Sequence, residues 1–313
     1  MPSQIDNHMP APALNWLARF ASLRVDFNKE LGRAPHKPLL LLAVLDLIES
    51  GLITDGWVTL SPDLILRFQN FWPIVQVRRC NRGDIRMPFH AIGTDGLWSL
   101  HDEDGRPSRA RSTSVRARLD DGLLIALSDF SFRAKLRRIL VSTYFPATEQ
   151  VALCAALGLE GVFESAEIAA LAEDQSAYRA ARETGRSARF KNQVVSGYHF
   201  TCALTGYRLT TADQTGIVEA AHIHQHAKSR NNDPDNGLAL TPTAHALFDM
   251  GLWSVADDLR ILVKPSGVFT EDFPLGGFSL RAYAERGLFL HPSNKLRPNS
   301  THLSWHRQEH GFE

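Results

Sequence analysis

The chain has 313 residues, 44% of them hydrophobic and 22% charged, and its 34 basic and 34 acidic residues give a formal net charge of zero. These values are typical of a globular protein large enough for two domains, and they argue against a wholly basic nucleic-acid-binding protein. No apolar run reaches the roughly 20 residues that span a bilayer, which argues against a membrane protein.

Apolar residues at helical spacing predict a helix over residues 13–31 and a second over residues 37–51. A short strand and a helix that begins at Ser61 are expected next. Residues 86–100 (RMPFHAIGTDGLWSL) are expected to form an apolar β-hairpin whose turn is TDG. Two further helical patterns close a first domain near residue 145.

The remainder of the chain divides into a connector and a second domain. Residues 146–188 are rich in Ala and Glu and favour a helical connector. From Arg189 onward the sequence predicts a helix, two strands (FTCALTG and IVEAAHI) and a helix (PTAHALFDMG). The expected fold class is therefore α+β, with a mixed α/β domain at 1–145, the connector at 146–188 and a C-terminal domain at 189–313.

Polar residues with catalytic chemistry are concentrated between residues 219 and 249. His222 ends an apolar strand, Asn236 lies in a DNG turn, and His245 follows nine residues later at the start of a helix. Asp249 lies four residues beyond His245, so both side chains project from one helical face. An imidazole and a carboxylate can bind a divalent cation, and a nearby histidine can act as a general base, which together would suit phosphodiester hydrolysis.

Residues 189–263 resemble an HNH nuclease domain, the ββα-metal fold. The resemblance rests on YHFTCALTG (198–206), AAHI (220–223), NGLAL (236–240) and HALFDMG (245–251). It implies that His222 is the general base, that Asn236 orients or braces the loop, and that His245 is a metal ligand. It also implies a divalent metal cofactor, which could be magnesium, manganese or another ion.

The sequence departs from the HNH pattern at Ala221. Many HNH nucleases have an Asp or a His metal ligand at that position, so another residue must replace it. Asp249 is the first candidate on geometry, although it could instead brace the helix, and Glu219 or His224 are alternatives. His224 could also bind phosphate or remain a solvated side chain.

The first domain contains a local excess of arginine that the zero net charge conceals. Residues 32–51 (GRAPHKPLLLLAVLDLIESG) and 86–100 resemble the N-terminal part of restriction endonucleases that recognise phosphorothioated DNA, in which a sulfur-binding domain precedes an HNH domain. That family carries an aromatic-proline pair followed by a small residue, and the matching positions here are Met87, Pro88 and Ala91. Methionine in place of the aromatic residue is a departure, and the same stretch is also consistent with an ordinary buried strand.

The resemblance and the charge pattern together define a set of candidate DNA contacts, in which the apolar residues would bind sulfur and the basic residues would bind phosphates. The set consists of His36, Lys37, Arg78, Arg79, Arg82, Arg86, Met87, Pro88, Ala91 and Lys228. Each has an alternative interpretation: His36 and Lys37 could cap a helix, and the arginines could form a solvated face.

The sequence thus predicts a modification-dependent restriction endonuclease that acts on double-stranded DNA, and the resemblance of its N-terminal part implies phosphorothioate as the modification. Two alternatives are an HNH DNase without modification preference and a DNA-binding protein with a degenerate nuclease domain. A homodimer is possible, because cutting two strands with one site per chain favours pairing. Three dispersed cysteines without a CxxC pair, and an N-terminus without a signal-peptide pattern, favour the cytoplasm.

Overall fold

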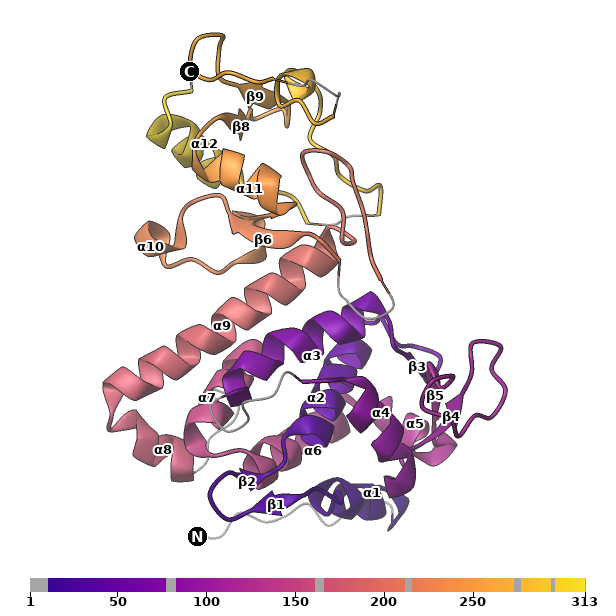
Figure 1. Ribbon diagram of the computed structural model, residues 1–313. Coiled ribbons are helices and arrows are strands. Elements are labelled where there is room, and N and C mark those ends of the chain that lie inside the picture. Colours follow the sequence, from indigo (N-terminus) through magenta and orange to yellow (C-terminus); the bar gives the residue numbers. More distant parts are fainter. Residues whose placement is uncertain are drawn as a thin grey trace. The chain divides into compact units, whose positions relative to one another are not determined.

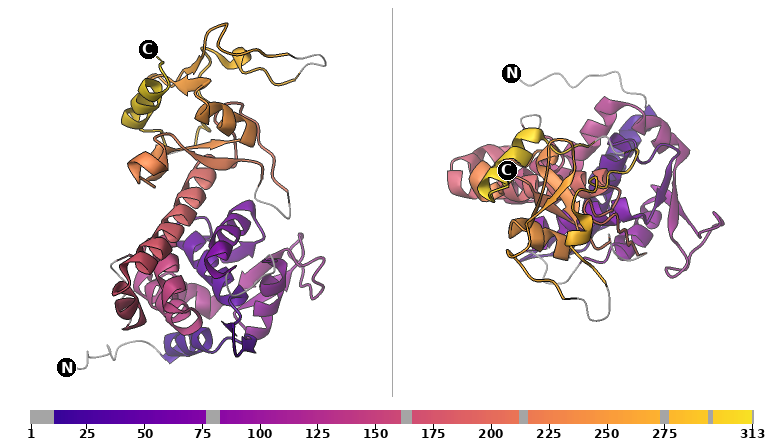
Figure 2. Two further views of the ribbon diagram at one scale, coloured as in Figure 1. Left: turned by 60° about the vertical axis from the view of Figure 1, so that its left-hand side comes forward. Right: turned by 90° about the horizontal axis from the view of Figure 1, so that it is seen from above.

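The computed structural model divides the chain into two compact units, residues 1–188 and 189–313. It describes residues 11–76, 83–160, 166–211, 216–272, 277–293 and 296–312, and the side chains of 11–14, 166 and 167 are not described. Helix α9 (Gln175–Gly197) begins in the first unit and ends in the second. The left view of Figure 2 shows α9 as one uninterrupted helix. None of the described helices is long and apolar enough to cross a membrane.

The first unit is mainly helical. Its helices are α1 (Ala11–Ala21), α2 (His36–Glu49), α3 (Pro62–Val75), α4 (Arg86–Ile92), α5 (Asp121–Leu127), α6 (Phe130–Tyr144), α7 (Ala147–Ala156) and α8 (Ala166–Ala172), followed by the first half of α9. Its strands are β1 (Phe27–Asn28), β2 (Gly32–Arg33), β3 (Trp57–Thr59), β4 (Trp98–His101) and β5 (Arg116–Leu119). β1 pairs with β2, and β3, β5 and β4 form a three-stranded antiparallel sheet in that order.

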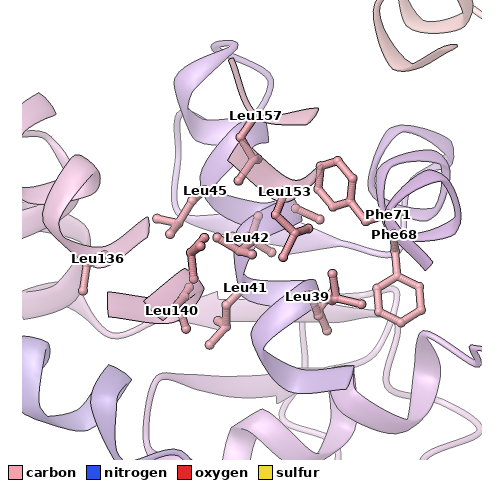
Figure 3. Packing of buried hydrophobic residues seen from close by; sticks show 14 of the residues in the cluster. Leu39, Leu41, Leu42, Leu45, Phe68, Phe71, Leu136, Leu140, Leu153 and Leu157 are labelled. Carbon is pink, nitrogen blue, oxygen red and sulfur yellow. The ribbon is translucent and has the colours of Figure 1, made fainter. Parts of the chain in front are cut away.

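Helix α2 forms the centre of the first unit. Its run of apolar residues from Leu39 to Leu45 is buried on every side, and α3, α4 and α6 pack against it (Figure 1). Figure 3 shows Leu42 and its neighbours meeting Phe68 and Phe71 of α3 and Leu153 of α7. Helix α7, within the predicted connector, therefore contributes to the core of this unit.

Two local predictions for the first unit are wrong. The helix expected over residues 13–31 ends at Ala21, and β1 and β2 form a small hairpin after it. Residues 86–100 form helix α4, a 3-10 turn at 93–95 and strand β4, instead of a hairpin. Pro88 fits this helix because it occupies the first turn, where a missing N–H breaks no intrahelical bond. A short apolar run bounded by glycines suits a helix or a strand equally well, and burial decides between them.

The second unit is built around a β-hairpin. Its elements after α9 are β6 (Glu219–His222), α10 (His226–Ser229), a 3-10 turn at Pro234–Asn236, β7 (Gly237–Leu240), α11 (Pro242–Asp249), β8 (Trp253–Val255), β9 (Ile261–Val263), η4 (Arg281–Tyr283) and α12 (Ser300–Glu309). β6 pairs antiparallel with β7, with His222 opposite Gly237. FTCALTG was expected to form a strand, but it forms a turn in which Thr201 makes one isolated bridge to Arg208.

A buried histidine joins α12 to the rest of the second unit. His306 is 2% exposed, its Nδ1 accepts a hydrogen bond from the Ser254 hydroxyl at 2.8 Å, and its Nε2 donates to the Phe248 carbonyl at 3.2 Å. Its ring also stacks on Phe248 with centroids 3.7 Å apart. Burial lowers the pKa of His306 to about 3, so the ring is neutral and can both accept and donate.

Candidate active site in the second unit

The β6–β7 hairpin positions the predicted catalytic residues. Gly237 stands opposite His222, and a Cβ atom at Gly237 would lie only 2.9 Å from the Phe190 ring of α9. The backbone of Gly237 is extended, so glycine is needed here for the close approach of α9 and not for an unusual φ angle. Helix α11 begins immediately after β7 and contacts both strands. The hairpin is therefore held by α9 and α11 at once.

His245 is joined to two carboxylates. Its Nδ1 lies 2.7 Å from Glu219 Oε1 at the start of β6, and its Nε2 lies 3.4 Å from Asp249 Oδ2, one turn along α11. The His245 side chain is 24% exposed, and the two carboxylates are about half exposed. The structure thus brings together His245 and two of the residues that the sequence offered as replacements for the ligand missing at Ala221, which is buried.

The chemistry of this group fits an open divalent-cation site. Glu219 can hold the Nδ1 proton of His245, which leaves Nε2 and the Asp249 carboxylate as donors. A carboxylate outside the coordination sphere commonly orients a metal-binding histidine in this way. Among the described residues, no group of three or more His, Cys, Asp and Glu side chains is already arranged to hold a metal ion. Two protein donors would leave most coordination positions to water and phosphate oxygens.

His222 belongs to a separate group of contacts at the other end of β6. Its Nε2 lies 3.0 Å from Asn232 Oδ1, and its ring stacks on Phe190 with centroids 4.0 Å apart and planes 8° apart. The His226 ring lies 5.3 Å away, and its Nε2 is 3.2 Å from Asn232 Nδ2. None of these contacts involves His245, Glu219 or Asp249. Strand β6 carries Glu219 at its first residue and His222 at its last, so it sets the distance between the two groups.

Asn236 braces the loop between the two strands. It is fully buried, its Oδ1 accepts from the His224 backbone N–H at 2.8 Å, and its Nδ2 donates to the carbonyls of His224 and Asn231 at 3.0 and 3.1 Å. Its own carbonyl accepts from Ile223 N at 2.9 Å. These bonds tie the segment that follows His222 to the start of β7.

His224 lies apart from His245. The strand ends at His222, and the His224 ring stacks on Trp305 of α12 with centroids 3.9 Å apart. Burial and the neighbouring His302 and Lys228 lower the pKa of His224. Lys228 is itself bound to Glu309 at 2.5 Å. The structure therefore does not join His224 to the His245 group, and it pairs Lys228 with a carboxylate.

The basic residues predicted near α2 have partners inside the first unit. Lys37 Nζ lies 2.6 Å from Asp95 Oδ2, with the two side chains only 11% and 6% exposed. Asp95 also accepts from the Arg24 backbone N–H. The His36 ring packs against Trp72 with centroids 4.9 Å apart. Lys37 thus fills a buried ion pair, which argues against its prediction as a phosphate contact.

Helix α4 carries the residues predicted to recognise sulfur. Met87 is 40% exposed and Ala91 half-buried on the same helical face, whereas Pro88 is buried. His90 Nε2 contacts the carbonyl of Arg109, which joins α4 to the arginine-rich loop between β4 and β5. Arg86 is half-buried at the start of α4. Arg78, Arg79 and Arg82 lie outside the described residues.

Sequence reasoning missed Asn232 and Phe190. Asn232 lies in the polar loop between the AAHI and NGLAL motifs. The only sequence evidence for its role was that a side-chain amide close to two histidines can form a hydrogen bond with each. Phe190 lies 32 residues before His222, and no local pattern links the two. The Phe190 contact depends on how the hairpin packs on α9.

Comparison with known proteins supports a nuclease domain at this place. Residues 202–256, which contain β6, β7 and α11, match the family described as HNH endonuclease. The match confirms the predicted HNH domain, which belongs to a family of phosphodiester hydrolases, and the chain has the expected α+β class.

One solved structure, titled "Modification dependent TagI restriction endonuclease", is similar with 21% sequence identity and a TM-score of 0.31. The similarity covers 40% of this chain and 38% of that chain, so it spans well under half of either protein. No curated protein matches the sequence.

Proposed function

We propose that this chain is a modification-dependent DNA endonuclease, in which the second unit hydrolyses the phosphodiester bond and the first unit recognises the modified duplex. The nuclease part rests on the His245–Glu219–Asp249 group, in which Glu219 shares strand β6 with His222 and the other two residues lie on α11, all within the segment that matches HNH endonucleases.

His222 is the proposed general base. With its Nε2 proton donated to Asn232, the neutral ring accepts a proton at Nδ1, which is where an attacking water would give it up. Asn236 keeps the backbone after His222 in place through its bonds to His224 and Asn231. Asn232 thereby holds the His222 ring, and Asn236 holds the backbone that follows it.

His245 Nε2 and Asp249 are the proposed holders of a divalent cation, which when bound would supply neutralisation of charge on the phosphate and the leaving oxygen. Glu219 orients His245 by accepting its Nδ1–H. Because only two protein donors are offered, the affinity of the free protein for the cation should be modest and should increase when DNA adds phosphate oxygens.

We expect His245→Ala and Asp249→Asn to weaken manganese binding strongly, and Glu219→Gln to weaken it about 10- to 100-fold, as removal of an outer carboxylate does. Calorimetric titration of the purified variants measures this. Asp257→Asn is the matched control, because Asp257 is an exposed carboxylate of the same unit that pairs with Arg307. Unchanged affinity in Asp249→Asn would remove Asp249 from the site.

The proposed mark is a phosphorothioate. Sulfur in place of a phosphate oxygen is larger and less hydrated, and the exposed face of α4 offers Met87 and Ala91 beside the arginine-rich loop. The arginines of this loop would bind the phosphates of any duplex, and that affinity would depend steeply on salt concentration. The apolar face would supply only the difference between sulfur and oxygen.

We expect full-length His222→Ala protein to bind a phosphorothioate duplex more tightly than the unmodified duplex by about 1–3 kcal/mol, the scale of a single specific contact. Adding Met87→Asp should erase this preference. Pro88 is unsuitable for the test because it is buried. Ile125→Asp is the control, since Ile125 is 74% exposed on α5 of the same unit.

Gel-shift titrations with both stereoisomers of the linkage, and with methylated and hydroxymethylated duplexes, separate the possible outcomes. Equal affinity for every duplex would reduce the proposal to an HNH DNase without modification preference. Preference for a modified base would keep the restriction role and replace its target. Cleavage of plain and modified plasmid with magnesium or manganese then tests the wild-type enzyme.

A further inference from the structure

We infer that Asn232 is a positioning residue that fixes the proton of His222 on Nε2 and so directs Nδ1 toward the reaction. The inference rests on the proposed function, in which His222 is the general base. Its starting point is the 3.0 Å contact between His222 Nε2 and Asn232 Oδ1. An amide oxygen only accepts, so Nε2 must donate, and a neutral imidazole that donates from Nε2 has its lone pair on Nδ1.

The second histidine completes the arrangement. Asn232 Nδ2 lies 3.2 Å from His226 Nε2, and an amide nitrogen only donates, so that ring nitrogen must accept. One side chain therefore assigns complementary tautomers to two histidines whose rings lie 5.3 Å apart. A carboxylate at this position would accept from both rings, and an aliphatic side chain would accept from neither.

The ring plane is set independently of the proton. Phe190 stacks under His222 with planes 8° apart, and the absence of a side chain at Gly237 lets Phe190 reach that position. Stacking restrains the tilt of the imidazole but is the same for either tautomer. The contact with Asn232, by contrast, distinguishes Nδ1 from Nε2, and this distinction decides which nitrogen can take the proton from water.

The test is a double-mutant cycle in the full-length protein. Asn232→Leu should slow single-turnover DNA cleavage about 10- to 100-fold, the scale seen when the partner that orients a functional histidine is removed. In the His222→Ala background the same change should cause no further loss, because the group it acts through is gone. Asn232→Asp keeps an acceptor oxygen and should stay within a few-fold of wild type. His226→Phe tests whether the effect depends on the second ring and should also be mild.

A second measurement does not depend on activity. Nitrogen NMR of histidine-labelled wild-type protein should show His222 protonated on Nε2, and Asn232→Leu should shift the ring toward a mixture of tautomers. A wild-type ring protonated on Nδ1 would overturn the inference, as would equal losses from Asn232→Leu in both backgrounds. If His222→Ala itself cleaves normally, the proposed base is wrong. If His222→Ala is inactive while Asn232→Leu cleaves normally, only the role of Asn232 is refuted.

Discussion

His222→Ala is expected to lower the rate of DNA cleavage by a factor of about 10²–10⁴ while folding and DNA binding stay close to those of the wild type. The side chain is half-buried at the end of β6, where its loss removes the proton acceptor but leaves the β6–β7 pairing and the bonds of Asn236 intact. Single-turnover cleavage of a labelled duplex measures the rate, and a gel shift measures the affinity.

His291→Ala serves as the control for this experiment. His291 is an exposed histidine of the same unit whose Nδ1 contacts Ser293, away from both groups of the candidate site. The control should cleave like the wild type. A His222→Ala protein that cleaves at the wild-type rate would show that another group activates the water.

Asn236→Ala should destabilise the second unit by about 3 kcal/mol or more. The change leaves the His224 N–H and the Asn231 carbonyl without their Asn236 partner, while the His224 carbonyl keeps its bond from the Ser229 hydroxyl, and each unpaired group costs about 1–3 kcal/mol. Denaturant unfolding monitored by tryptophan fluorescence measures the loss. Cleavage should fall with it, because the segment that carries His222 and His224 is no longer tied to β7.

Asn236→Asp is the informative companion variant. It keeps an oxygen for the His224 N–H but turns a second oxygen toward two carbonyls, so it should be at least as unstable as the alanine variant. A variant of either kind that unfolds like the wild type and yet fails to cleave would instead place Asn236 in contact with DNA or the cation.

The sequence was sufficient for β6 and α11 of the nuclease domain because their patterns lie within 31 residues, whereas strand β7, the partner of β6, was not predicted. The strand end at His222, the turn at Asn236 and the helical spacing of His245 and Asp249 are all local patterns, and each element formed where it was predicted. The bracing role of Asn236 was implied by the resemblance to HNH domains, and its hydrogen bonds to His224 and Asn231 agree with that role. Local patterns did not predict that Glu219 pairs with His245. The sequence offered Glu219 only as one of three candidates for the missing metal ligand.

The remaining errors share a physical cause. Where a local sequence pattern fits two structures equally well, burial and contacts with residues far away in the sequence decide which structure forms. RMPFHAI satisfies a strand pattern and a helix pattern, and packing against α2 selects the helix. His224 could have continued the strand, but a tryptophan 81 residues later holds its ring. Nothing near these residues in the sequence carries that information.

The pair formed by Lys37 and Asp95 changes how a mutational survey of the first unit should be interpreted. A single substitution at Lys37 leaves an uncompensated carboxylate in the interior and commonly costs about 3–5 kcal/mol, so the variant would lose DNA binding through destabilisation of the domain even if Lys37 never touches DNA. A screen that ranks positions by binding alone would therefore not separate a role of Lys37 in folding from a contact with DNA.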